Sequence, residues 1–227
     1  MTILYEDNHI IIVNKTCSEI VQADKTGDTP LSETVKNYIK EKYNKPGNVF
    51  VGVPHRLDRP VSGIVVFART DKALSRLNEM FRTHQIRKTY WAIVKDAPNP
   101  PAAELTHYLI RKEKMNKSFA YDKEVRDSKK SILSYKTIAR SDKYFLLEIE
   151  LQTGRHHQIR CQLAKIGSPI KGDLKYGAAR SNPDGGICLH ARSVEFIHPV
   201  SQEKISIVAP LPENDVLWRV LSSFVGK

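Results

Sequence analysis

The amino-acid sequence predicts an α+β protein, built on a mixed, mainly antiparallel β-sheet with flanking helices. Short runs rich in Ile, Val, Tyr and Phe recur along the chain with few residues between them, which is typical of hairpin-linked strands. Helical periodicity occurs in only three segments, and these do not alternate regularly with the strands, so Rossmann and barrel classes are excluded. We expect a single domain over residues 1–227.

The strands are predicted from alternation and from β-branched or aromatic residues. The pattern is clear in HIIIV near the N-terminus and in KYFLLEIELQ near the middle of the chain. Few residues separate most of these runs, so we expect them to pair mainly as antiparallel neighbours. The predicted strands cover residues 3–5, 9–13, 61–69, 88–95, 104–111, 131–139, 143–152, 193–197 and 204–208.

The helices are predicted where apolar residues repeat at spacings of three and four, over residues 30–41, 71–85 and 156–166. Thr29 precedes the first helix as its expected N-cap, and Gly167 is expected to stop the third.

The remaining segments are expected to be loops, at residues 96–102, 112–130 and 178–187. The middle one is strongly charged. It is either an RNA-facing flap or a solvated excursion, and the sequence alone favours the excursion.

The composition favours a polyanionic partner. Lys and Arg number 36 against 25 Asp and Glu, which leaves a formal net charge of +11. A surplus of this size attracts phosphates and releases their counterions, so nucleic acid is the first candidate, although a merely solvated basic surface has the same composition.

The sequence contains neither a membrane span nor a secretory signal, so we expect a cytoplasmic protein. Cys17, Cys161 and Cys188 are odd in number and widely separated, which favours reduced thiols over a disulfide framework or a cysteine metal site.

One carboxylate stands among cations in the segment HRLDRPVSG, where Asp58 precedes a turn and the apolar strand that follows. Loops at the ends of strands commonly build functional sites. The structural alternative is a salt bridge from Asp58 to Arg56 or Arg59, and taken alone this segment favours that alternative.

Two further segments carry candidate residues. In TGRHHQIR, a strand passes through Gly154 into a helix, which places Arg155 beside unpaired backbone N–H groups and predicts an anion-binding corner. In RKTYWA, alternation places Lys88 and Tyr90 on one face of the sheet. A strand tyrosine either packs in a core or stacks on a base, and its position does not decide between the two.

Taken together, these segments closely resemble the RluA-type pseudouridine synthases, in order over nearly the whole chain. The resemblance rests on HRLD followed by Ser-Gly, on Lys-Thr-Tyr, on TGRHHQIR, on GSPIKGD with Tyr-Gly, and on Leu-His-Ala with FIHP. The resemblance implies that the chain converts uridine to pseudouridine inside an RNA, at a site in a central cleft of the sheet.

The resemblance also implies the residue roles. Asp58 would be the catalytic carboxylate, and Arg155 would pair with it. Tyr90 would pack against the base and relay a proton, while Arg56 would fill the space left by the flipped uridine. Ile159 would form an apolar wall near the base. Lys88, which belongs to the same Lys-Thr-Tyr motif as Tyr90, is expected at the uridine site.

The chemistry that the resemblance implies needs these residue types. Uracil must leave C1′ and rejoin it through C5, and a carboxylate can attack C1′, stabilise positive charge there or remove a sugar proton. A neighbouring guanidinium keeps the acid ionised. The oxidation state does not change, so no cofactor is expected. The partner would be ribosomal or transfer RNA, not DNA or a membrane, and the protein would act as a monomer.

The sequence departs from the family pattern at two positions, and a metal site and a non-catalytic domain are also considered as alternatives. Val61 and His156 depart from the residues usual in this family, which leaves the identity of the RNA open. The adjacent histidines His156 and His157, with His55 and Asp58, have no metal-site spacing, so no metal is expected. A non-catalytic RNA-binding or chaperone domain on the same fold would have the same charge, but it would gain nothing from a carboxylate in a phosphate-binding cleft.

Overall fold

The computed structural model of the chain describes residues 1–213 and 215–226. Four helices and ten strands are assigned among them, and the chain divides into two compact units. The first unit is made of residues 1–87 and 191–210, and the second of residues 88–190 and 211–227. The α+β class, with a mixed, mainly antiparallel sheet and flanking helices, is confirmed; the single domain and the central cleft stay predictions.

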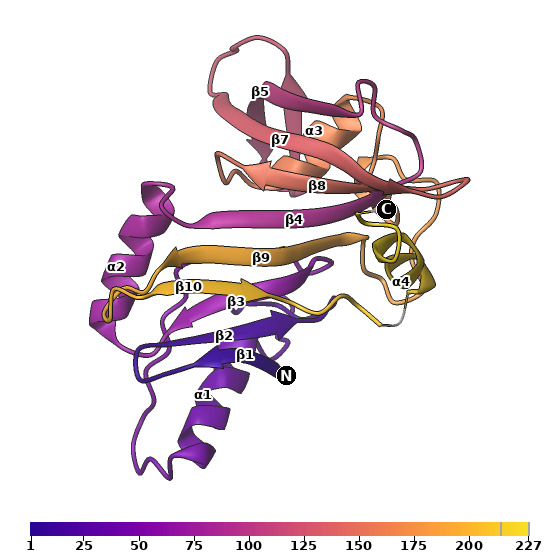
Figure 1. Ribbon diagram of the computed structural model, residues 1–227. Coiled ribbons are helices and arrows are strands. Elements are labelled where there is room, and N and C mark those ends of the chain that lie inside the picture. The colour runs from indigo at the N-terminus through magenta and orange to yellow at the C-terminus, as the bar shows by residue number, and fades with distance from the viewer. Residues whose placement is uncertain (214, 227) are drawn as a thin grey trace. The chain divides into compact units, whose positions relative to one another are not determined.

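The first unit has the strand order β1-β2-β3-β9, with β10 paired to β9 (Figure 1). The pairs β1–β2, β2–β3 and β9–β10 are antiparallel. The elements are β1 (Thr2–Glu6), β2 (Ile10–Lys15), α1 (Leu31–Lys42), β3 (Ser62–Ala68), α2 (Asp71–Arg82), β9 (Leu189–Ile197) and β10 (Lys204–Val208).

The core of the first unit lies between α2 and the sheet. The central strands β2 and β3 are buried almost throughout, because they are nearly continuous runs of Ile, Val and Phe. Ala73, Leu77 and Met80 of α2 pack against alternate residues of β2 and β3. The strand pattern therefore fixes which side chains face the helix.

The helices α1 and α2 differ in their N-caps. Thr29 was predicted to cap α1, but Pro30 occupies that position and makes no side-chain hydrogen bond. Pro30 has the extended backbone that the cap position requires, so the helix begins one residue later. In α2 the hydroxyl of Thr70 accepts from Ala73 N at 3.2 Å, as a capping threonine does.

The second unit has the strand order β4-β8-β7-β5-β6, and all four pairings are antiparallel. The helix α3 lies against β5 and β6, where Leu109, Cys161 and Tyr176 form a small buried cluster. The elements are β4 (Arg87–Val94), β5 (Ala102–Lys112), β6 (Lys117–Tyr121), β7 (Lys129–Arg140), β8 (Phe145–Leu151), α3 (Gln158–Lys165) and α4 (Val216–Ser222), with short 3₁₀ turns η1 (Glu113–Met115) and η2 (Leu174–Tyr176).

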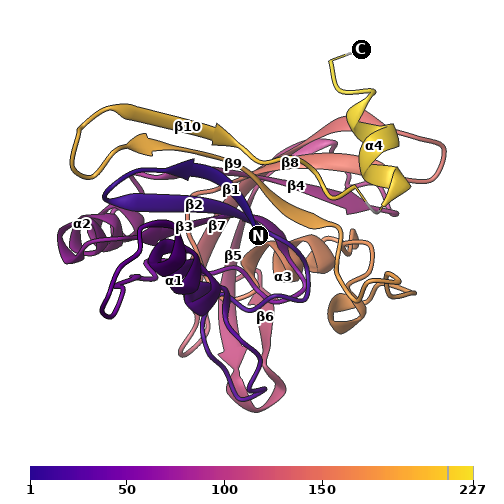
Figure 2. The ribbon, with the colours of Figure 1, turned by 90° about the horizontal axis from the view of Figure 1, so that it is seen from below.

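The strand β6 corrects the predicted loop 112–130, because five of its residues pair with β5 in a hairpin (Figure 2). The outer edge of β6 is covered at Ser118. Its N–H donates to the Tyr176 hydroxyl at 2.8 Å, and its carbonyl accepts from the Cys161 thiol at 3.2 Å. A side chain therefore meets the backbone where a further strand would pair.

Every predicted strand and helix overlaps an observed one, and the differences are at the ends. The third helix was predicted from residue 156 but begins at Gln158, because His157 adopts a left-handed conformation with φ of 54°. Gly167 ends this helix as predicted, with φ of 82°. Among the described residues, no helix is long and apolar enough to cross a membrane.

Candidate active site

Asp58 lies in a tight turn directly before β3. The carbonyl of Asp58 accepts from Val61 N at 3.0 Å, which closes the turn. Leu57 beside it is buried, while Asp58 itself is half-buried. Upstream, Gly52 exchanges two backbone hydrogen bonds with Ala68 of β3, so both ends of the Asp58 loop are attached to the same strand.

The Asp58 turn is held by a buried lysine, Lys15, which no sequence motif indicated. Lys15 is 1% exposed, and its ammonium donates to three carbonyls, those of Val61 at 2.6 Å, Thr16 at 2.9 Å and Arg59 at 3.0 Å. Burial lowers the pKa of Lys15 to about 8, although nearby anionic groups, Asp58 among them, oppose this change. Lys15 therefore connects β2 to the residues that follow Asp58.

Arg59 points to a different part of the first unit. Its guanidinium lies 2.6 Å from Asp28 Oδ2 and 3.5 Å from Asp24 Oδ2, and it donates to the Thr26 hydroxyl at 2.7 Å. The structural alternative for Asp58 named Arg59 as one of two possible partners. The acids that pair with Arg59 here are Asp24 and Asp28, while Arg56, the other candidate partner, is exposed.

The residues around the turn have structural roles that explain their types. Gly63 has φ of 112°, and a Cβ there would lie 2.4 Å from the carbonyl oxygen of Ala191 on β9, so only glycine fits. His55 Nε2 accepts from Val66 N at 2.9 Å, and its ring stacks on Phe81 at 4.4 Å. The Nε2 atom of His55 is therefore occupied by a hydrogen bond from a backbone N–H group.

In the second unit, β4 carries Lys88 and Tyr90. Tyr90 is opposite Ile149 of β8 and is only 7% exposed. Burial lowers the pKa of Lys88. The Lys88 ammonium lies 4.0 Å from the position that a Cβ on Gly154 would occupy, so Lys88 reaches the turn that carries Arg155.

The turn that carries Arg155 is closed by the side chain of Gln158. Its Oε1 accepts from Arg155 N at 3.0 Å and from the Thr153 hydroxyl at 2.8 Å, and its amide donates to the carbonyl of Ile132 on β7 at 3.1 Å. The N–H of Arg155 is therefore already hydrogen-bonded to Gln158 and is not available to an anion. The prediction of an anion-binding corner is wrong for this N–H group. Ile159 follows on α3 and is buried.

Asp173, the last residue of the run GSPIKGD, forms an ion pair with Arg160. Both residues are buried, and the guanidinium donates to the two carboxylate oxygens at 2.7 and 2.8 Å. The backbone of Asp173 forms a turn as well, because its carbonyl accepts from Tyr176 N at 3.0 Å. A carboxylate held in this bidentate geometry suits a structural role.

The adjacent histidines His156 and His157 directly follow Arg155 and support the turn that carries it. His157 Nδ1 lies 3.0 Å from the Tyr176 hydroxyl, and the rings of His156 and His157 stack at 3.7 Å. Burial and nearby cations lower the pKa of His157 to about 2, so its ring is neutral. Among the described residues, no cluster of three or more His, Cys, Asp or Glu has the arrangement of a metal site.

The predicted site residues fall into two sets. Lys88, Tyr90, Arg155 and Ile159 belong to the second unit, where the strand β4, one turn and the helix α3 position them, while Arg56 and Asp58 belong to the first. The ion pair of Asp58 with Arg155 stays a prediction.

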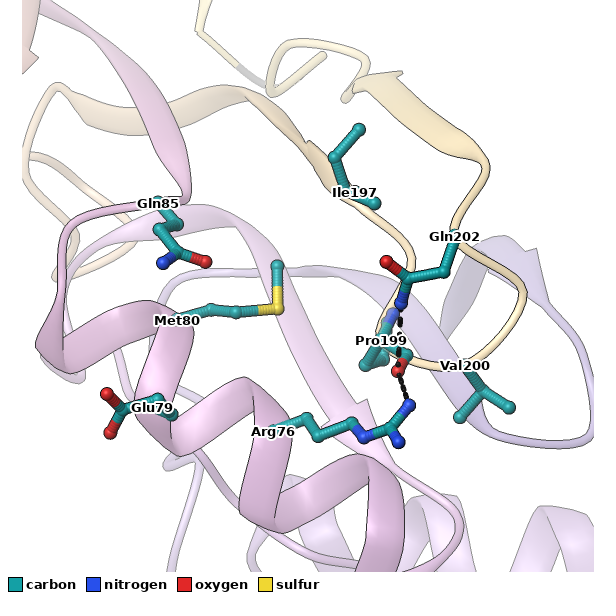
Figure 3. Close-up of a pocket in the computed structure, with 8 residues that line it drawn as sticks. All are labelled: Arg76, Glu79, Met80, Gln85, Ile197, Pro199, Val200 and Gln202. Carbon is teal, nitrogen blue, oxygen red and sulfur yellow. Dashed lines mark hydrogen bonds between the residues drawn. The ribbon is translucent and has the colours of Figure 1, made fainter.

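A groove of about 520 Å³ lies elsewhere in the first unit, between α2 and the turn that joins β9 to β10 (Figure 3). None of the predicted site residues lines it. Its arginine, Arg76, donates to the carbonyl of Pro199 at 2.5 Å, and Gln202 contacts the same oxygen. The cation in this groove is therefore already bound to the backbone.

Comparison with known proteins gives one consistent result. Residues 9–165 match the family model described as RNA pseudouridylate synthase. The chain is 32% identical to ribosomal large subunit pseudouridine synthase D of Xanthomonas campestris pv. campestris, over 98% of this chain and 69% of that protein. It is 29% identical to tRNA pseudouridine synthase C of Vibrio cholerae, over 100% of this chain and 96% of that protein.

The fold has solved counterparts as well. The structure of human RNA pseudouridylate synthase domain containing 4 superposes with a TM-score of 0.79, at 23% identity, over 93% of this chain and 89% of that one. The human domain containing 1 gives a TM-score of 0.73 at 21% identity, over 95% and 86% of the two chains. These two likenesses concern the fold.

Proposed function

Because this chain belongs to the RNA pseudouridylate synthase family, we propose that it isomerises uridine to pseudouridine within RNA with Asp58 as its catalytic carboxylate. The observation that supports Asp58 as the catalytic carboxylate is the geometry of the turn that holds it. Asp58 is half-buried, and buried Lys15 fixes the backbone on its C-terminal side through two carbonyls of that turn. Membership of an enzyme family leaves the non-catalytic RNA-binding alternative without support.

The reaction exchanges one bond for another. The bond from N1 of uracil to C1′ breaks, a bond from C5 to C1′ forms, C5 loses its hydrogen and N1 ends with one. No electrons are gained or lost overall, so substrate and product are isomers. An ionised Asp58 is suited to attack C1′, or to remove a sugar proton and so start an elimination. Both routes require the carboxylate to face the ribose.

The other residues are proposed to hold the base and the acid. Arg155 would pair with Asp58 and keep it ionised, which a carboxylate in a closed site requires. Tyr90 would pack against the detached uracil and relay a proton, since it is buried and its strand is paired with β8. Ile159 would form the apolar wall.

The two flanking cations have separate proposed tasks. Lys88, which reaches the Arg155 turn, would contact the uridine or its phosphate. Arg56 is exposed, so it would enter the space that the flipped uridine leaves in the RNA. Flipping costs a few kcal/mol of unstacking, and a guanidinium plane replaces part of that stacking.

We also propose that the protein acts as a cytoplasmic monomer. Relatives are named for ribosomal and for transfer RNA, so both RNA classes are candidate substrates here. The basic surface, with a formal charge of +11, supports binding to either.

The decisive experiment compares Asp58→Asn with wild type in a strain that lacks the gene, using transcriptome-wide carbodiimide mapping of pseudouridine. Asparagine keeps the shape of the side chain but cannot act as a nucleophile or base at C1′. We expect wild type to restore a specific mark and Asp58→Asn to restore none.

The matched control is Asp142→Asn, an exposed aspartate between β7 and β8, which should restore the mark fully. Restoration by Asp58→Asn to the level of this control would show that the catalytic assignment is wrong.

A further inference from the structure

The β5–β6 hairpin concentrates positive charge at its turn. Residues 111–130 contain eight Lys and Arg against four Asp and Glu. Lys112, Lys114 and Lys117 lie within six residues at the turn, and we refer to residues 112–117 as the hairpin tip. Lys112 and Lys114 are exposed, and Lys117 is half-buried. Like charges so close together repel one another unless an anion lies between them.

The cations of the hairpin tip surround an aromatic ring. Lys112 and Lys117 are cross-strand partners, and their ammonium groups lie 5.0 and 5.5 Å from the centre of the Phe119 ring. The carboxylates of the described residues form no ion pair with either lysine. Phe119 itself is half-buried, and lysines gathered at an aromatic ring are a combination that binds nucleic-acid strands, through phosphates and stacked bases.

The hairpin tip is attached to the turn that carries Arg155. His156, the next residue along, has Nε2 3.1 Å from Asn116 Oδ1 and Nδ1 2.9 Å from the Ser118 hydroxyl. The same hydroxyl donates to the His156 carbonyl at 2.7 Å, and Lys175 donates to the Asn116 carbonyl at 3.0 Å. These contacts fix the tip beside Arg155.

We propose that the hairpin tip binds the phosphates of the RNA strand next to the target uridine, through Lys112, Lys114 and Lys117. This inference rests on the proposed function, because it takes the uridine site to lie at Arg155. The tip is held against that turn, so a strand with its uridine at Arg155 passes within reach of these lysines. In Figure 2 the turn of the hairpin lies beyond α3.

The test is the variant Lys112→Gln/Lys114→Gln/Lys117→Gln, with binding of a fluorescein-labelled stem–loop RNA measured by anisotropy over a series of salt concentrations. Loss of three phosphate contacts should raise Kd about tenfold or more and reduce the slope of log K against log salt by about 2. The control is Lys95→Gln/Lys136→Gln/Lys143→Gln. It removes the same charge from exposed lysines of the same sheet, near the end of β5 that is away from the hairpin tip, and it should leave the slope as in wild type.

Equal slopes for the tip variant and the control would overturn the proposal and make the hairpin a solvated excursion. A second readout separates this failure from failure of the proposed function. At saturating RNA, release of tritium from C5 of labelled uridine should stay near the wild-type rate in the tip variant, and it should be lost in Asp58→Asn while the salt slope of that variant is retained. A lowered rate at saturation in the tip variant would also count against a phosphate-binding role, because such contacts act on binding alone.

Discussion

Lys15 places a positive charge inside the first unit, where its ammonium donates hydrogen bonds to three backbone carbonyls. Three acceptors match the three N–H donors of an ammonium, so the bonding favours the charged form while burial disfavours it. The pKa is lowered to about 8, compared with 10.5 for a free lysine. Between these two values the folded protein binds fewer protons than the unfolded chain.

The substitution Lys15→Met tests this balance. Because the unfolded chain holds the extra proton, the contribution of Lys15 to the free energy of unfolding should rise with pH from about 8 to 10.5, by about 1 kcal/mol per pH unit. Urea unfolding of wild type and Lys15→Met over this range gives the difference directly, and Lys40→Met, at an exposed position of α1, supplies the baseline. A difference that is constant or falls would mean that the three carbonyls outweigh burial.

The candidate site illustrates how far single residues can be read from sequence. Asp58, Tyr90 and Arg155 were selected because their motifs are recognisable in the chain itself. Lys15 was not, because a lysine at the end of a strand looks like any surface lysine until its burial is known. The left-handed conformation of His157 was also missed, and the Tyr176 hydroxyl that its side chain contacts lies nineteen residues later in the sequence.

At the scale of elements, helix capping makes a direct test. Thr70 accepts from Ala73 N at the start of α2, so Thr70→Ala should lower the free energy of unfolding by about 1 kcal/mol. Thr29, the cap predicted for α1, lies one residue before the observed N-cap and is the matched control. Thr29→Ala should change stability by less than about 0.5 kcal/mol, measured by urea unfolding at one pH. Equal losses in the two variants would contradict the cap assignments.

The two elements that escaped sequence analysis did so for physical reasons. The strand β6 has small residues, Ser118 and Ala120, facing α3 and places Phe119 on the other face, which reverses the usual apolar-in pattern. Its position within a charged segment hid it further. The helix α4 is short, although Asp215 before its apolar run is an N-cap signal that accepts from Leu217 N at 2.9 Å.

At the scale of the whole molecule, the formal charge of +11 governs association with RNA. We expect Kd for a non-substrate stem–loop RNA to rise about tenfold to a hundredfold between about 50 and 200 mM salt, because each phosphate contact releases counterions. Anisotropy titrations measure this, and Asp58→Asn should show the same dependence. Binding that does not change with salt would rule out a phosphate-dominated interface.

The cover over the outer edge of β6 has a consequence for how these molecules coexist. A bare edge strand offers unpaired amides and carbonyls to any neighbouring chain, and it is the usual starting point for aggregation. Here the phenol of Tyr176 and the thiol of Cys161 occupy the donor and the acceptor of Ser118. An approaching copy finds no free backbone donor or acceptor at that residue, so a further strand cannot be added to β6 there.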